Sequence, residues 1–346
     1  MVLSSLCFGL ELQASGTSEI AGIYKIPLTS AGGRANFVSA PMQPKPVFRG
    51  KVSAISGNTI TLEGSPRLAA GAYSQAVVGS FNFAQYLVLL RKDASSSPGN
   101  AGDWFGIVSN TENQLTLTPG LALPSTSFGV GDEIEIRRMT SIKDLFGSGA
   151  SCILNKDNDA DITQSQEDII RLTAGTGFAE QIIYHNGEVV DEGYYVEDSH
   201  DPDGSKITLA PDEVLWVFRK TGSATVNAVS AGRAQSTPLT HYLAAGANSL
   251  ATGFAVPSAV GTSGLLEAGW VSDVNEDLVI GEDGIIRSLQ GTGFVDTVFH
   301  YAGVNADPGW YLNDTLSPEY PLPAGQGLMY FSVNSLIWRQ PAPFNP

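Results

Sequence analysis

An acid-rich loop is the part of this sequence whose residue types and spacing best suit chemistry. Carboxylates stand at every second position, at Asp157, Asp159 and Asp161. Oxygen ligands in such alternation are typical of calcium-binding loops, so the pattern predicts a Ca²⁺ site. Ile162 stands where a calcium loop needs glycine for its sharp turn, and this favours the other interpretation, a solvated acidic loop ahead of a strand. We expect no cofactor other than calcium.

The motifs of common hydrolases and metalloenzymes do not occur in the sequence. It contains no Gly-x-Ser-x-Gly, His-Glu-x-x-His or Cys-x-x-Cys, and no glycine-rich loop that ends in Gly-Lys-Ser/Thr. His185 and His300 occupy nearly equivalent positions in two similar segments, which indicates a structural role. The 35 acidic residues leave a carboxylate pair for glycoside hydrolysis open. We nevertheless expect a protein that is not an enzyme and has no catalytic residues.

Two features suggest contact with carbohydrate. Tyr194, Tyr195, Trp310 and Tyr311 would suit an aromatic platform for sugars, but they recur at sheet positions, which is more typical of packing between strands. The sequence Asn-Asp-Thr from Asn313 is a glycosylation sequon, so Asn313 is a candidate glycan site in a host that modifies such sites.

The elements that must position these residues come in two similar copies. Residues 169–178 read Ile-Ile-Arg, three further residues, then Gly-Thr-Gly-Phe, and residues 285–294 repeat this pattern. The offset is 116 positions, and Asp157 and Asp161 also have aspartates 116 positions later. This self-similarity predicts two copies of one β-rich module.

Short apolar or alternating runs, many turn residues and no sustained helical period predict an all-β protein. A single helical turn is expected at residues 142–146. We predict two tandem modules resembling sandwiches or barrels, with a small β-barrel inserted into the first. The expected parts are an N-terminal extension at 1–19, a first module at 20–46 plus 139–233, an insert at 47–138 and a second module at 234–346.

The N-terminal extension carries its own strand pattern. Leu6, Phe8, Leu10 and Leu12 alternate with Cys7, Gly9 and Glu11, and a polar link follows at residues 13–18. Such a strand either folds back onto its own domain or inserts into the sheet of a neighbouring subunit as a donor strand. In the second case Leu6, Phe8, Leu10 and Leu12 form the subunit interface.

Composition limits the partners. The chain has 35 acidic and 19 basic residues and a net charge of −16, which argues against nucleic acid and anionic membrane surfaces because both are polyanions. It has no apolar run long enough for a transmembrane helix, so no membrane insertion is expected. With only 16% charged residues, the mixture is typical of an exported protein. Cys7 and Cys152 either form a disulfide or remain free thiols.

Several turn-and-strand signatures give the chain a family resemblance. They are Gly-x-Val-Ser to Ile-Thr-Leu at 50–62, Gly-Asp-x-Ile-x-Ile at 131–136, Leu-Phe-Gly at 145–147, Ala-Asp-Ile at 160–162 and Pro-Ala-Gly-Gln-Gly at 323–327. Over about residues 21–338 the chain resembles an uncharacterised family of exported bacterial β-rich proteins. The resemblance implies export, and it lends no activity, cofactor or catalytic residue.

These observations together predict a structural subunit of an extracellular filament or surface assembly. Its partners would be other copies of itself, joined head to tail by strand complementation. The alternative is a secreted carbohydrate-binding or adhesion protein that binds glycans. Both place the protein outside the cell or at its surface.

Overall fold

The computed structural model describes residues 21–30, 35–94, 100–118, 124–158, 166–174, 177–196, 198–275, 277–290, 293–303 and 307–343. Over these ranges the protein is all-β, as the sequence predicted, and its few helices are single turns. None of the helices it describes is long and apolar enough to cross a membrane. The expected N-terminal strand at residues 6–12 lies outside the described residues.

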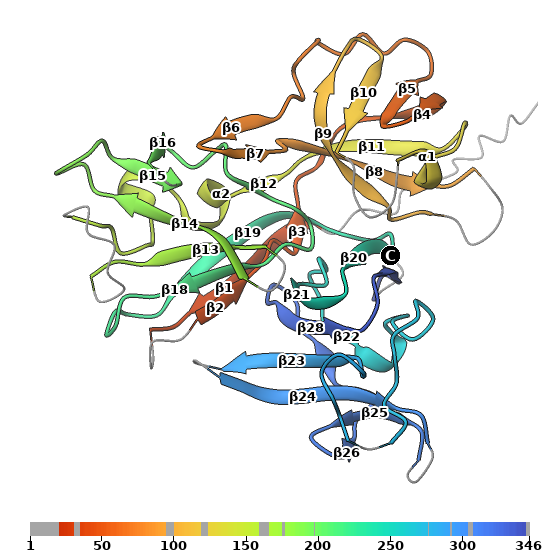
Figure 1. Ribbon diagram of the computed structural model, residues 1–346. Helices are drawn as coiled ribbons and strands as arrows, with labels where there is room; N and C mark the ends of the chain where they lie inside the picture. Colours follow the sequence, from red (N-terminus) through yellow and green to blue (C-terminus); the bar gives the residue numbers. More distant parts are fainter. Residues whose placement is uncertain are drawn as a thin grey trace, which may run out of the picture.

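A closed six-stranded barrel occupies the region of the expected insert (Figure 1). Its strands, in barrel order, are β10 (Gln114–Leu117), β5 (Thr59–Leu62), β4 (Pro46–Ser56), β11 (Glu133–Arg138), β8 (Tyr86–Lys92) and β9 (Trp104–Asn110). The interior is filled by apolar side chains such as Val52, Ile60, Val88 and Ile134, all at most 1% exposed. Because a closed barrel has no edge strand, it offers no main-chain template to a partner. The hairpin of β6 (Ala76–Val78) and β7 (Phe81–Phe83) and the short helix α1 (Pro124–Ser127) lie outside the barrel order.

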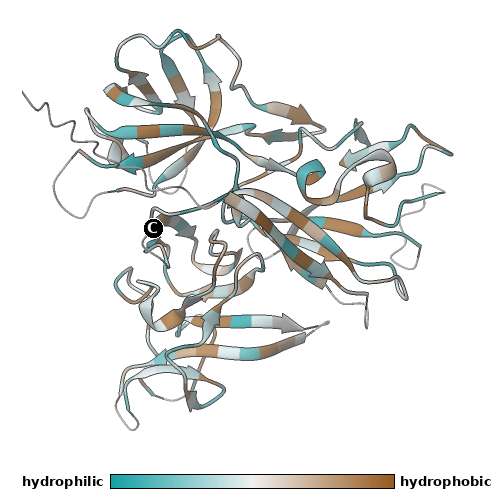
Figure 2. Ribbon diagram, turned by 180° about the vertical axis from the view of Figure 1, so that it is seen from behind, coloured by the Kyte–Doolittle hydropathy of each residue, from teal (hydrophilic) through white to brown (hydrophobic). Residues whose placement is uncertain are grey.

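The first β-unit, as we name it, contains a six-stranded antiparallel sheet packed against a smaller sheet. The larger sheet has the order β16 (Ser199–Asp201), β15 (Gly193–Val196), β14 (Gly177–His185), β13 (Ile169–Ala174), β18 (Leu215–Phe218) and β2 (Ala35–Val38). The smaller sheet has the order β1 (Ala21–Leu28), β19 (Val226–Ala234) and β3 (Met42–Gln43). Ile26 and Leu28 of β1 share one core with Ile170, Ile182 and Val217 of the larger sheet. Apolar and polar positions alternate along such strands in Figure 2, as one buried face requires.

A capped helical turn closes the core of the first β-unit. Helix α2 (Ile142–Phe146) begins after Ser141, whose hydroxyl accepts from the Asp144 N–H while the Asp144 carboxylate accepts from the Ser141 N–H. This reciprocal capping box satisfies two backbone donors that the helix start leaves free. The helix therefore confirms the turn expected at residues 142–146. Nearby lie the pair β12 (Thr140–Ser141) with β17 (Thr208–Leu209) and the 3-10 turn η2 (Gly149–Ser151).

The second β-unit also has a six-stranded sheet. Its order is β21 (Gly246–Leu250), β28 (Leu328–Ser332), β23 (Ile285–Gln290), β24 (Gly293–Tyr301), β25 (Gly309–Leu312) and β26 (Thr315–Leu316). Two strand pairs and a 3-10 turn accompany it: β20 (Leu239–Leu243) with β29 (Leu336–Gln340), β22 (Ser258–Ala259) with β27 (Pro321–Leu322), and η3 (Val260–Thr262). In both six-stranded sheets the central hairpin, β13–β14 or β23–β24, has the same neighbours in the same sequence order. The isolated bridge Asp157–His185 also has a counterpart 116 positions later, Asp273–Tyr301.

The two β-units meet at a junction made by main-chain contacts. Glu213 forms an antiparallel bridge with Leu250, and the Ser39 N–H donates to the Gly325 carbonyl at 3.2 Å. The Tyr24 hydroxyl donates to the Ala324 carbonyl at 3.0 Å. The barrel joins the same region, because the Trp104 indole N–H donates to a carbonyl of β20 at 3.0 Å. Backbone and side-chain hydrogen bonds therefore both hold the two β-units together at this junction.

Candidate functional site

Two places in the described fold gather groups that can bind something. The first is a cluster of three carboxylates in the second β-unit, and the second is a groove at the junction of the two β-units.

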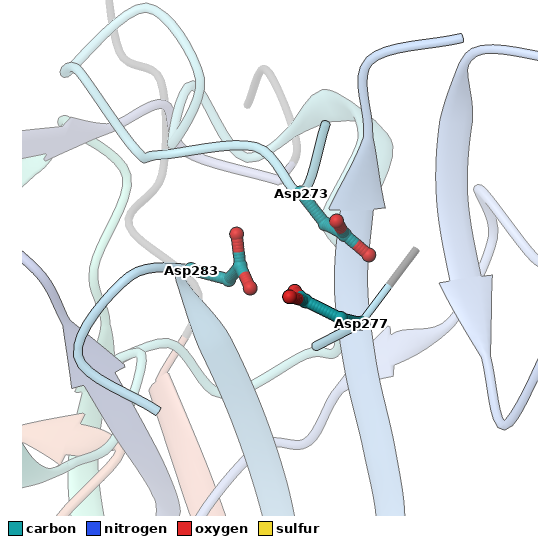
Figure 3. A group of neighbouring side chains, drawn as sticks. All are labelled: Asp273, Asp277 and Asp283. Atoms are coloured by element: carbon teal, nitrogen blue, oxygen red, sulfur yellow. The ribbon is translucent and has the colours of Figure 1, made fainter. Parts of the chain in front are cut away.

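Asp273, Asp277 and Asp283 form the carboxylate cluster, with one ligand oxygen from each within 4.8 Å of the others (Figure 3). Asp273 is held by its backbone, because its N–H donates to the His300 carbonyl and its carbonyl accepts from the Ala302 N–H. Asp283 lies two residues before the start of β23. Asp273 and Asp283 are buried and Asp277 is exposed, so the cluster opens to solvent on one side.

The three carboxylates of this cluster repel one another electrostatically. Burial raises the pKa of Asp283, and the negative charges of Asp273 and Asp277 raise it further, while the Val279 N–H at 2.7 Å lowers it. Neighbouring donors already bind part of the cluster, since Asn275 donates from its backbone to Asp273 and from its side chain to Asp277. A hard divalent cation with oxygen ligands, such as Ca²⁺, would neutralise the remaining repulsion.

Asp157, the first carboxylate of the acid-rich loop singled out from the sequence, lies in the first β-unit at the place that matches Asp273. Asp157 is buried, and its carboxylate lies 2.7 Å from the His185 ring nitrogen Nδ1. Asp159 and Asp161 lie outside the described residues. Sequence reasoning missed Asp283, although the 116-residue offset places Glu167, also a buried carboxylate, at the equivalent position. Pairing every acidic residue with an acidic residue 116 positions later would have identified Asp283 as the third carboxylate of the cluster.

Calcium is expected to raise the melting temperature of the full-length protein through the Asp273–Asp277–Asp283 cluster. Binding to the folded state alone stabilises it by about 1.4 kcal/mol when the free ion is at ten times its dissociation constant. In Asp283→Asn the repulsion is relieved without the ion, so the variant should be more stable than wild type in chelator and should lose the calcium response. Differential scanning fluorimetry with Ca²⁺ and with EDTA measures both. An equal calcium shift in wild type and variant would contradict this site.

The remaining candidate residues are packed rather than free. Tyr194 and Trp310 are 0% and 3% exposed, so neither can present a ring face to a sugar. Tyr311 is stacked on Phe299 at 5.7 Å between ring centroids. For Tyr194 and Trp310 this burial agrees with the packing role that the sequence favoured over an aromatic platform. Asn313 lies on an exposed turn between β25 and β26, where its side-chain oxygen accepts from the Thr297 N–H.

Histidines in the described chain take part in structural pairs. His241 is fully buried between the Asp212 carboxylate, at 3.2 Å, and the Gln340 amide, at 3.0 Å. His300 shares a hydrogen bond of 2.8 Å with Ser272, and burial lowers its pKa. Cys152 has no disulfide partner among the described residues, which do not include Cys7, and its sulfur lies 3.7 Å from the Tyr194 hydroxyl.

The second candidate place, which we call the junction groove, has a volume of about 430 Å³. It lies between β2 of the first β-unit and β23, β24 and β27 of the second. Phe37, Pro321 and Leu328 line its apolar part, and Ser288 and Asp296 line its polar part.

Polar side chains that line the junction groove form hydrogen bonds with one another. The Asp296 carboxylate accepts from the Ser288 hydroxyl at 2.8 Å and from the Tyr320 hydroxyl at 3.1 Å. Burial, with the nearby Asp296 charge, raises the pKa of Tyr320 to about 12, so this hydroxyl remains a donor at neutral pH. The groove thus offers apolar walls and strand edges more than free charge.

Comparison with known protein families, with curated proteins and with solved structures finds no match to this chain.

The junction also contains a carboxylate that responds to pH. Glu213 bridges to Leu250 through its backbone, and its carboxylate accepts from the Ala210 N–H at 2.9 Å. Burial raises the pKa of Glu213 to about 7, the Ala210 N–H opposes this, and the neighbouring Asp212 charge adds to it. Because the folded pKa lies above the ordinary value of 4.5, folding favours the protonated acid.

Stability of the wild-type protein is expected to fall as the pH rises from 4.5 through 7. The Glu213 contribution is fully present below its unfolded pKa and is lost above its folded pKa, a change of about 2 kcal/mol after solvent screening. Glu213→Gln mimics the protonated acid and should lose less stability over this range. Urea denaturation at pH 5 and pH 8 measures the difference, and parallel losses in both proteins would show that Glu213 is not the group responsible.

Proposed function

We propose that this protein is a non-enzymatic structural subunit that polymerises head to tail into a filament or surface layer outside the cell. In this proposal the N-terminal strand of each subunit completes the β-structure of the next. The observation that carries it is the pairing of two features. The first is the sequence pattern of a strand with an apolar residue at every second position, Leu6, Phe8, Leu10 and Leu12. The second is the presence, in the described fold, of edge strands that have a hydrogen-bonded neighbour on one side only.

Free edges are where sheets accept added strands. The barrel has none, but β1 and β2 each pair on one side only among the described strands. Proteins that remain monomeric protect such edges, whereas strand-exchanging subunits use them. A donor in one subunit and an acceptor elsewhere on the next make a heterologous contact, and such contacts propagate into a filament when the rotation does not close.

We further infer that the two β-units are copies of one module and that the barrel is an insertion into the first. The shared strand order of the two six-stranded sheets supports this, as does the recurrence of the aspartate bridge at the 116-residue offset. Asn36 and Asn248 add to it, because each donates across to a carbonyl of the neighbouring strand, that of Val217 or Tyr330. A doubled scaffold gives a filament subunit length without a second gene product.

The energetics of strand exchange suit assembly. A strand that buries roughly 400 Å² of apolar surface contributes on the order of 10 kcal/mol before ordering costs, which reduce that figure sharply. The net charge of −16 repels subunits at long range and keeps them soluble, so the apolar strand must supply the attraction. Salt should therefore promote assembly by screening this repulsion.

Sedimentation velocity of the purified full-length protein tests the proposal. The expected result is a broad distribution of species whose mean size grows with protein concentration and with salt. A single monomeric species at all concentrations up to the millimolar range would overturn the proposed function.

A further inference from the structure

We propose that the junction groove is the acceptor site for the N-terminal strand, and that its occupant is residues 6–12 of a second copy of this chain. This inference rests on the proposed function and names where in the neighbouring subunit the strand binds. It places the contact between subunits at the seam of the two β-units.

Strand edges on both sides make this groove suited to an extended segment. On one side, β2 lies at the end of its sheet and, among the described strands, pairs with β18 alone, from Leu215–Val38 to Phe218–Ala35. On the other side, the ladder between β23 and β28 stops at Arg287 and Met329, so β23 continues from Ser288 without a ladder partner on that side in the described chain. A strand laid between these edges can hydrogen-bond through its backbone to either β-unit.

The walls of the groove match an amphipathic strand. The exposed rings of Pro27 and Pro321 supply apolar surface over the buried Phe37 and Leu328, while Asp296 accepts hydrogen bonds from Ser288 and Tyr320. In the N-terminal segment every second residue is a large apolar one, which lets one face enter the groove while Cys7, Gly9 and Glu11 lie at its open side, where the exposed Gln326 also lies. The lining also includes polar side chains such as Thr29 and Gln326, which can bond to the backbone N–H and C=O groups of an extended strand.

The direction of β1 favours a second copy over the same chain. Pro27, near the end of β1, lines the groove, but the N-terminal segment joins at Ala21, at the other end of the strand. Six residues of strand put these points about 20 Å apart, at roughly 3.3 Å per residue. To fill its own groove, the link of residues 13–20, which spans at most about 30 Å when fully extended, would have to run back over this distance beside β1. The groove of a neighbour imposes no such path.

Disulfide trapping tests the site with the cysteine that the strand already carries. Gln326 is exposed on the groove wall, so Gln326→Cys in a Cys152→Ser background leaves one groove thiol and the natural Cys7. Two batches with tags of different mass are mixed, assembled and oxidised. Non-reducing gels should show a crosslink that joins both tags, and it should vanish with Cys7→Ser. Val77→Cys, 65% exposed on the β6 hairpin, is the matched control and should give at least tenfold less product.

The outcomes separate the site from the function. Assembly without a Gln326→Cys crosslink between chains would overturn the groove and leave the proposed function standing, whereas a chain that never assembles would overturn both. A crosslink confined to single chains would show that the groove holds its own strand and would also overturn the inference. Gln326→Trp, which fills the groove with a bulky ring, should raise the concentration needed for assembly at least tenfold, and Val77→Trp should not.

Discussion

Leu10→Asp is expected to abolish assembly and leave a folded monomer. The variant removes the leucine that the proposed contact would bury, a loss of about 2–5 kcal/mol in protein cores, and would place a carboxylate against apolar walls. Since each 1.4 kcal/mol is a tenfold change in affinity, subunit association should weaken at least 100-fold. Static light scattering at matched concentrations measures the loss, and circular dichroism shows whether the β-fold persists.

A substitution on the opposite face of the expected strand provides the control for this prediction. Cys7 stands on the opposite face of the expected strand, so Cys7→Ser should assemble as wild type does. If Leu10→Asp assembles normally, or if both substitutions impair assembly equally, the alternation has no role and the donor-strand mechanism fails. A synthetic peptide of residues 1–13 should also slow filament growth, because it competes for the acceptor.

Asp168→Ala is expected to give the largest loss of stability in the described chain, about 3–5 kcal/mol. The Asp168 carboxylate is 0% exposed and forms an ion pair of 2.8 Å with the Nε of Arg219, itself 2% exposed. It also accepts from the Lys220 N–H at 2.6 Å and from both the backbone and side-chain nitrogens of Asn155. Alanine would leave a buried guanidinium and several N–H groups without their acceptor.

Equilibrium urea denaturation measures the loss in free energy of unfolding of Asp168→Ala. A variant that removes an exposed ion pair serves as the control. Lys92 and Glu133 lie 3.9 Å apart with most of the lysine in solvent, so Lys92→Ala should change the free energy of unfolding by no more than about 0.5 kcal/mol. A loss below about 1 kcal/mol in Asp168→Ala would mean that water replaces the carboxylate and that the first β-unit does not depend on this pair.

Local patterns predicted the parts of the fold that depend on nearby residues. The strands around Ile170 and Ile286, the helical turn after Ser141 and the hairpins of the barrel follow from apolar alternation, caps and turn residues. Strand β19 was not predicted. Its sequence is mostly small residues, yet eight of its positions pair with β1, so tertiary pairing overrides its weak intrinsic preference.

The sites were harder to predict because they join residues far apart in the chain. Asp273 and Asp277 were visible through the repeat, but Asp283 joins them only when the loop before β23 folds back. The junction groove brings Phe37 beside Leu328, and Glu213 beside Leu250, across long sequence separations. No periodicity within a single segment encodes such contacts, because they depend on how two β-units pack.

Negative-stain electron microscopy of the full-length chain beside a chain lacking residues 1–13 tests the central claim most directly. If the leading strand of each subunit completes its neighbour, filaments form from the full-length chain, and the shortened chain gives only single particles of unchanged fold. Filaments of the same width from the shortened chain would show that another surface joins the subunits.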